Sequence, residues 1–182
     1  VGADTSYSDT TGAGMFAWCW KGDGVSGGTL NENGTLDSQV NVNTTAGFSI
    51  VTYTNNNTAG ATVGHGLSQA PEMIMNKTTT GTYGWFNYHI GLDATAPEDY
   101  YNNLNVTSAR YDSASDGWND VAPTATVFSL GQEGTNSVGG LDVLAYCWHS
   151  VEGYSKIGKY EGNGQGDGPF VYTGFQVAWL IV

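Results

Sequence analysis

Short runs in which apolar and polar residues alternate, bounded by clusters of Gly and Asn, follow one another along most of the chain. Such runs, rich in β-branched and aromatic residues, are typical of strands with one face in a core. The runs with this pattern are Phe16–Trp20, Phe48–Thr54, Met73–Lys77, Tyr83–Ile90, Thr126–Leu130, Leu141–Val151, Ser155–Tyr160 and Phe170–Val182. A short helical turn fits only residues 96–101. The pattern therefore predicts an all-β fold, an antiparallel β-sandwich of the jelly-roll kind.

Four blocks of the chain occur twice, in the same order. The pairs are Met15–Trp20 with Val143–Trp148, 47–53 with 153–160, Gly66-Leu67 with Gly174-Phe175, and Met73–Met75 with Leu180–Val182. The first pair matches in residue type at every position, and the second matches with one inserted residue. The spacing between the first two blocks is longer in the first copy, which places an insert within 22–46.

A repeat this long indicates whole β domains in tandem, because solenoid repeats have much shorter periods. We expect residues 1–21 to be the end of a preceding repeat and 22–46 to be a linker or hairpin insert rich in Gly, Asn and Thr. Residues 47–152 are then one complete β-sandwich repeat, and 153–182 the start of the next. The chain ends on an apolar strand, so we expect it to be a segment of a longer polypeptide.

The two cysteines, Cys19 and Cys147, occupy the same place in the two copies. We expect each to be a small buried hydrophobe of its own unit, too far from the other to form a disulfide. Trp18 and Tyr146 precede them in the matching blocks, and we assign both to the structural core as well.

The amino-acid composition argues against several classes of protein. Five Lys and Arg against 17 Asp and Glu give a formal charge of −12, and a nucleic-acid partner is excluded because phosphate contacts need clustered cations. A hydrophobic content of 40% argues against disorder, and 27 glycines argue against a helical bundle. No apolar run reaches the roughly 18 residues of a membrane span, so we expect no membrane insertion.

Catalytic and cofactor motifs are missing from the sequence. Residues 162–168 resemble a phosphate-binding glycine loop, but a strand follows where that loop needs a helix. His65, His89 and His149 have no partner at metal-ligand spacing. We find no combination of nucleophile, base and orienting group, and therefore expect no enzymatic activity and no cofactor.

Residues 112–117 begin like a calcium-binding loop. The third and twelfth positions of this loop are Ala114 and Pro123, where an EF-hand requires oxygen ligands, so an EF-hand is excluded. Asp112, Asp116 and Asp120 stay as candidates for a single surface Ca²⁺, and no other metal site is expected.

Aromatic residues gather in the middle of the complete repeat. They are Trp85, Tyr88, Tyr100, Tyr101, Tyr111 and Trp118. Two interpretations stay open: packing inside the sandwich, or an exposed patch on which sugar rings stack. The patch is the candidate binding site.

From about Met15 onward the chain carries an ordered series of short motifs. They are Thr45–Tyr53, Ala61–Leu67, Ala70–Glu72, Ala122–Thr124, Val127–Gly131, Ala145–Trp148, Val151–Lys156 and Asp167–Phe175. The series resembles a domain repeated in tail fibre-like and uncharacterised structural proteins of marine tailed phages. This resemblance implies virion-associated architecture and carries over no catalytic residue. Asp93–Asp120 is the stretch least like that family.

These observations lead to one main hypothesis and two alternatives. The main hypothesis is a structural fibre or spike module of a tailed phage that contributes to host-surface attachment and is located on the virion or outside the cell. Its partners would be other copies of itself, other virion proteins and a host surface glycan. The alternatives are a capsid decoration or extracellular filament subunit without a receptor role, and a carbohydrate-binding module of a larger secreted protein.

Overall fold

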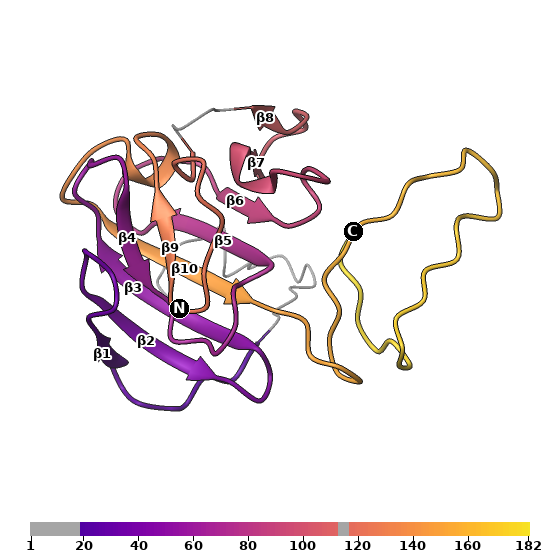
Figure 1. Cartoon of the computed structure of the whole chain (residues 1–182), viewed down its shortest axis with the longest axis horizontal. Coiled ribbons are helices and arrows are strands. Elements are labelled where there is room, and N and C mark those ends of the chain that lie inside the picture. Colours follow the sequence, from indigo (N-terminus) through magenta and orange to yellow (C-terminus); the bar gives the residue numbers. More distant parts are fainter. Residues whose placement is uncertain (1–18, 113–116) are drawn as a thin grey trace, which may run out of the picture.

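A computed structural model of the chain describes residues 19–112 and 117–182 (Figure 1). Eight strands form one antiparallel sheet in the order β1-β2-β3-β10-β5-β6-β7-β8, and two form a second sheet, β4-β9. The strands are β1 Thr29–Asn31, β2 Ser38–Asn43, β3 Phe48–Thr54, β4 Ala61–Gly64, β5 Met73–Thr78, β6 Phe86–His89, β7 Tyr100–Asn103, β8 Tyr111–Asp112, β9 Val127–Leu130 and β10 Asp142–Trp148. The described residues also contain the short 3₁₀ turns η1 Pro97–Asp99 and η3 Gly134–Asn136. No helix in this part of the chain is long and apolar enough to cross a membrane.

The centre of the large sheet is β10, which lies between β3 and β5. Its side chains alternate, so that Val143, Ala145 and Cys147 are buried while the residues between them are partly exposed. Cys147 is paired with Ser49 on β3 and with Ile74 on β5. This register directs one face of all three strands into a shared core.

The small sheet covers that buried face. Val63 of β4 and Phe128 of β9 are opposite each other in the register and both are fully buried. The ring of Phe128 contacts Tyr53 of β3, with ring centroids 6.1 Å apart. The two sheets therefore enclose one hydrophobic core in a sandwich-like arrangement.

The prediction of an all-β antiparallel fold is confirmed, and the strands predicted at 48–54, 73–77, 126–130 and 141–151 are present with small shifts of their ends. The helical turn expected at 96–101 is η1. The two layers are unequal, eight strands against two, whereas a jelly roll divides its strands evenly. The insert 22–46 holds β1 and β2, which pair antiparallel and extend the sheet beyond β3.

The strands predicted at Ser155–Tyr160 and Phe170–Val182 are wrong for this structure. Residues 149–182 leave the sheet after β10 and run through an extended loop, drawn orange to yellow in Figure 1, with one isolated bridge between Val151 and Ser155. A strand needs a neighbour to accept and donate its backbone hydrogen bonds, and no strand lies beside this segment in the described chain.

The cysteine residues differ in their surroundings, although their blocks match. Cys147 is fully buried, as predicted, and burial raises the pKa of its thiol to about 12. Cys19 is exposed, which corrects its assignment to the core, and both thiols are free. Tyr146 is only half-buried because it lies on the opposite face of β10 from Cys147. Trp18 lies outside the described residues.

Candidate functional site

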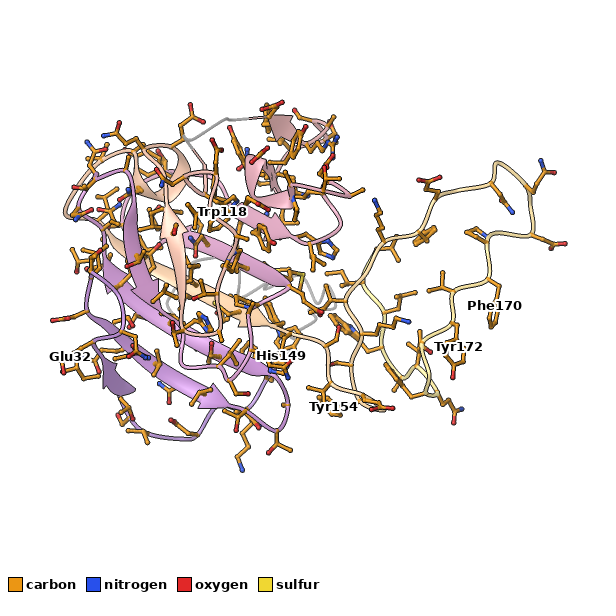
Figure 2. The ribbon with its side chains drawn as sticks, viewed as in Figure 1. Glu32, Trp118, His149, Tyr154, Phe170 and Tyr172 are labelled. Carbon is orange, nitrogen blue, oxygen red and sulfur yellow. The ribbon has the colours of Figure 1, made fainter. Side chains whose placement is uncertain are left out.

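The six aromatic residues of the predicted patch divide between the core and the surface. Trp118, labelled in Figure 2, is 1% exposed and Tyr88 is 3% exposed, so neither offers an exposed ring on which a sugar could stack. The ring of Trp118 contacts the rings of Phe86, Tyr88 and Phe128, with centroids 5.3, 5.8 and 6.3 Å away. These two residues fill the space between the sheets, and this corrects their assignment to the patch.

The other aromatic residues lie on or beside β6, β7 and β8, at one edge of the large sheet. We call Tyr101 and Tyr111, which are opposite each other in the register, the tyrosine face; Tyr100, the neighbour of Tyr101 on β7, points to the other face of the strand. Tyr101 stacks between buried Phe86 and Tyr111, with ring centroids 4.2 and 5.1 Å apart. Tyr111 ends this stack and is 38% exposed. The stack therefore leads from the core to a ring that a ligand can reach. Trp85, the remaining aromatic residue, is half-buried and directly precedes β6.

Arg110, the single arginine of the sequence, covers the third tyrosine. Its guanidinium carbon lies 4.0 Å from the ring centroid of Tyr100, and Nη1 donates to Asp93 Oδ2 at 3.1 Å. Asp93 Oδ1 accepts from the Thr95 backbone N–H and hydroxyl, both at 2.9 Å. These Thr95 hydrogen bonds, with that from Arg110, hold the pKa of Asp93 well below its usual range. The same edge of the sheet thus carries a cation fixed between the ring of Tyr100 and the carboxylate of Asp93.

Two shallow hollows flank β6 and β7, one on each face, because successive side chains of a strand point to opposite faces. The hollow on the side of Phe86 and Tyr101 measures about 280 Å³ and is also lined by Tyr83, Asn103 and Asn105. The other measures about 220 Å³ and is lined by Met73, Met75, Asn87, His89, Asn102 and Leu104.

The smaller hollow holds two amide oxygens with no hydrogen-bond partner in the described chain. Asn87 and Asn102 are opposite each other in the register, and the Oδ1 atoms of both are buried and unpaired. Asn87 Nδ2 donates to the backbone oxygens of Asn102 and Trp85, at 3.2 and 3.3 Å. Both oxygens are covered by protein, so the hollow does not expose them to a ligand.

Of the three aspartates considered for Ca²⁺, the structure describes two. Asp112 lies on β8 and Asp120 follows Trp118 in a turn, while Asp116 lies outside the described residues. Among residues 19–112 and 117–182, no three His, Cys, Asp or Glu side chains come together as metal ligands.

Sequence reasoning did not single out Arg110, Asn87 or Asn102. One feature of the sequence could have pointed to Arg110: it is the single arginine of an acidic chain, and it is followed by the aromatic residue Tyr111. The two asparagines had no such feature, because the chain is rich in Asn and only the β6–β7 register brings them together.

Comparison with known proteins gives one match. The family model described as Domain of unknown function (DUF7483) matches residues 1–182. No curated protein and no solved structure matches the chain.

Proposed function

We propose that this chain, which belongs to the DUF7483 family, is a structural module of a fibre or spike on the virion of a tailed phage, where it contributes to attachment at the host surface. The observation that carries the proposal is the internal repeat. The folded unit contains one copy of the 47–53 block and the second copy of the Met15–Trp20 block, Val143–Trp148, and the next matching block begins at Gly153, after β10. Tandem units of this kind are an economical way to build a long fibre.

The surface and the motifs support the same proposal. A charge of −12 keeps an extended β protein soluble and resists non-specific association. The ordered motifs from Thr45 to Phe175 resemble a domain of tail fibre-like phage proteins. The proposed partners are further copies of this chain, other virion proteins and a host surface glycan. The role requires no catalysis and no cofactor.

Electron microscopy of purified particles, labelled with an antibody against the chain, tests this function. Label on a tail fibre or spike is the expected result. An ordered lattice of label over the capsid would instead support a decoration protein, and label on filaments free of particles would support an extracellular filament subunit. Either of these outcomes contradicts the attachment role.

The tyrosine face favours a second candidate function, carbohydrate binding. Sugars stack on exposed aromatic rings, and the exposed ring of Tyr111 offers this kind of contact. This function is compatible with a fibre that recognises a host glycan, and also with a module of a larger secreted protein.

The glycan interaction is tested with a glycan array followed by titration of the best-bound sugar. Tyr111→Ala should weaken that binding by about threefold to tenfold, because one stacking contact is lost. Tyr154→Ala is the matched control, since Tyr154 is an exposed tyrosine of the C-terminal segment, away from the tyrosine face (Figure 2). An array without signal, or equal losses in the two variants, would remove this candidate.

A further inference from the structure

Two Asn-Gly dipeptides occur in the sequence, Asn33-Gly34 and Asn163-Gly164. In such a dipeptide the backbone nitrogen of glycine can attack the side-chain amide carbon of the preceding asparagine, because glycine has no side chain to block the approach. Both asparagines are exposed, but the backbone that follows them is held very differently. The difference decides which of the two can react in the folded protein.

The first dipeptide is fixed against the small sheet. Gly34 lies so close to β4 that a Cβ at this position would overlap the Thr62 backbone oxygen and lie 2.9 Å from the Val63 Cα. The next residue is held as well, because the Thr35 backbone N–H donates to Thr62 Oγ1 at 2.9 Å. Attack on Asn33 requires this backbone to rotate, and the contacts with β4 oppose the rotation.

The second dipeptide lies in a loop with open space around it. Residues 161–168 are all exposed, and they belong to the long C-terminal loop that leaves the sheets (Figure 1). A Cβ on Gly164 would meet no atom within 4 Å outside its chain neighbours, and the φ of this glycine is +66°. The backbone nitrogen of Gly164 can therefore turn toward the side chain of Asn163 without breaking a packed contact.

Two hydrogen bonds orient the side chain of Asn163. Its Oδ1 accepts from the Gln165 backbone N–H at 3.0 Å, and its Nδ2 donates to the Asp167 backbone oxygen at 2.9 Å. A donor on Oδ1 withdraws electrons from the amide carbon and stabilises the negative charge that develops on this oxygen during attack. The loop therefore both leaves the amide accessible and activates it.

We propose that Asn163 is a site of spontaneous deamidation, at which the loop gains a carboxylate without an enzyme. The Gly164 backbone nitrogen bonds to the side-chain carbon of Asn163 and gives up its proton. The side-chain NH₂ group leaves with this proton as ammonia, and the product is a cyclic succinimide. One water molecule then opens the ring at either carbonyl. The result is aspartate, or isoaspartate in which the backbone runs through the former side chain.

The modification changes the contacts of the loop. Aspartate at position 163 has no N–H to donate to the Asp167 backbone oxygen, so this hydrogen bond is lost. The new carboxylate also adds a negative charge to a chain that already carries −12. Residues 163 and 167 are then no longer held together, and the loop changes its conformation with the age of the protein.

Peptide mapping of the full chain by mass spectrometry, with samples taken over weeks in neutral buffer, tests the proposal. Asn163 should gain one mass unit at least about tenfold faster than Asn33 in the folded protein. In water enriched in heavy oxygen, the product at position 163 should also take up one heavy oxygen atom, because ring opening adds it from the solvent. In guanidinium the two rates should become similar, since the contacts of Gly34 with β4 are then lost.

Gly164→Ala should slow the conversion of Asn163 by about tenfold, because the added methyl group hinders the approach of the nitrogen. Gly162→Ala is the matched control: Gly162 precedes Asn163 in equally open surroundings but does not supply the attacking nitrogen, so the rate should stay unchanged. Equal rates at Asn33 and Asn163 in the folded chain, conversion of Asn163 only after unfolding, or equal effects of the two alanine variants would overturn the proposal. The particle labelling and the glycan array do not depend on this chemistry, so their failure leaves it untouched.

Discussion

Replacement of Trp118 by alanine should lower the free energy of unfolding by about 3–5 kcal/mol, the range for removing a large buried aromatic side chain. Trp118 is 1% exposed and contacts three other core rings, Phe86, Tyr88 and Phe128. Two of these rings belong to the large sheet and Phe128 belongs to the small one. The substitution therefore removes both the apolar area that Trp118 buries and the contact that it makes between the layers.

Urea or guanidinium unfolding, followed by circular dichroism, measures this change. Tyr111→Ala is the control, because Tyr111 belonged to the same sequence-predicted patch but is 38% exposed; its effect should stay within about 1 kcal/mol. If Trp118→Ala were no more destabilising than Tyr111→Ala, the assignment of Trp118 to the core would be wrong.

His65 should make the protein less stable in acid, by up to about 3 kcal/mol, as the pH falls from its ordinary pKa of 6.5 to about 4. Its ring is fully buried, Nε2 lies 3.1 Å from the Thr124 backbone oxygen, and Nδ1 accepts from the Leu67 backbone N–H at 3.2 Å. Burial lowers the pKa of His65 to about 4, so the folded state holds it neutral. The unfolded chain gains a proton below about pH 6.5 and the folded chain only below about pH 4, so stability is lost between these values.

The measurement compares the wild type with His65→Gln over this pH range, because glutamine also offers a donor and an acceptor but does not titrate. The carboxylates are the same in both proteins and cancel in the difference. We expect the wild type to lose about 3 kcal/mol more than the variant between about pH 7 and about pH 4. Parallel stability curves would contradict the neutral, buried state of His65.

Where one face of a strand is buried, the sequence pattern located the element well. Phe48–Thr54 is predicted and observed with the same ends, because its apolar residues alternate with residues that face outward. β2 and β4 were not predicted, since β2 has only two apolar residues among Ser, Gln and Asn and β4 is only four residues long. Their pairing with neighbouring strands makes them part of a sheet.

The candidate site was predicted in part. The position of aromatic residues around β6–β8 was visible, but the sequence does not determine which of them face the core. Trp118 occupies a turn, where no period of two or of 3.6 residues predicts burial, and the fold places it beneath Phe86. The ion pair of Arg110 with Asp93 and its contact with the Tyr100 ring also join residues that are separated in the sequence and that the fold brings together.

The C-terminal segment shows most clearly how the neighbours of a sequence decide its structure. Residues 47–53 and 153–160 match closely, yet only the first block contains a strand. β3 lies between β2 and β10, whereas residues 154–160 have no strand on either side in the described chain. The second block has Lys156, Gly158 and Lys159 where the first has Ile50 and Thr52, so it has a lower strand propensity as well as no neighbouring strand.

Hydrogen exchange of the full chain tests the central claim most directly: the strands from β1 to β10 form one folded unit of two sheets, and residues 154–160 lie outside both sheets. The amides of Phe48–Thr54 should exchange slowly and those of 154–160 rapidly. Equal protection of the two blocks would contradict the account.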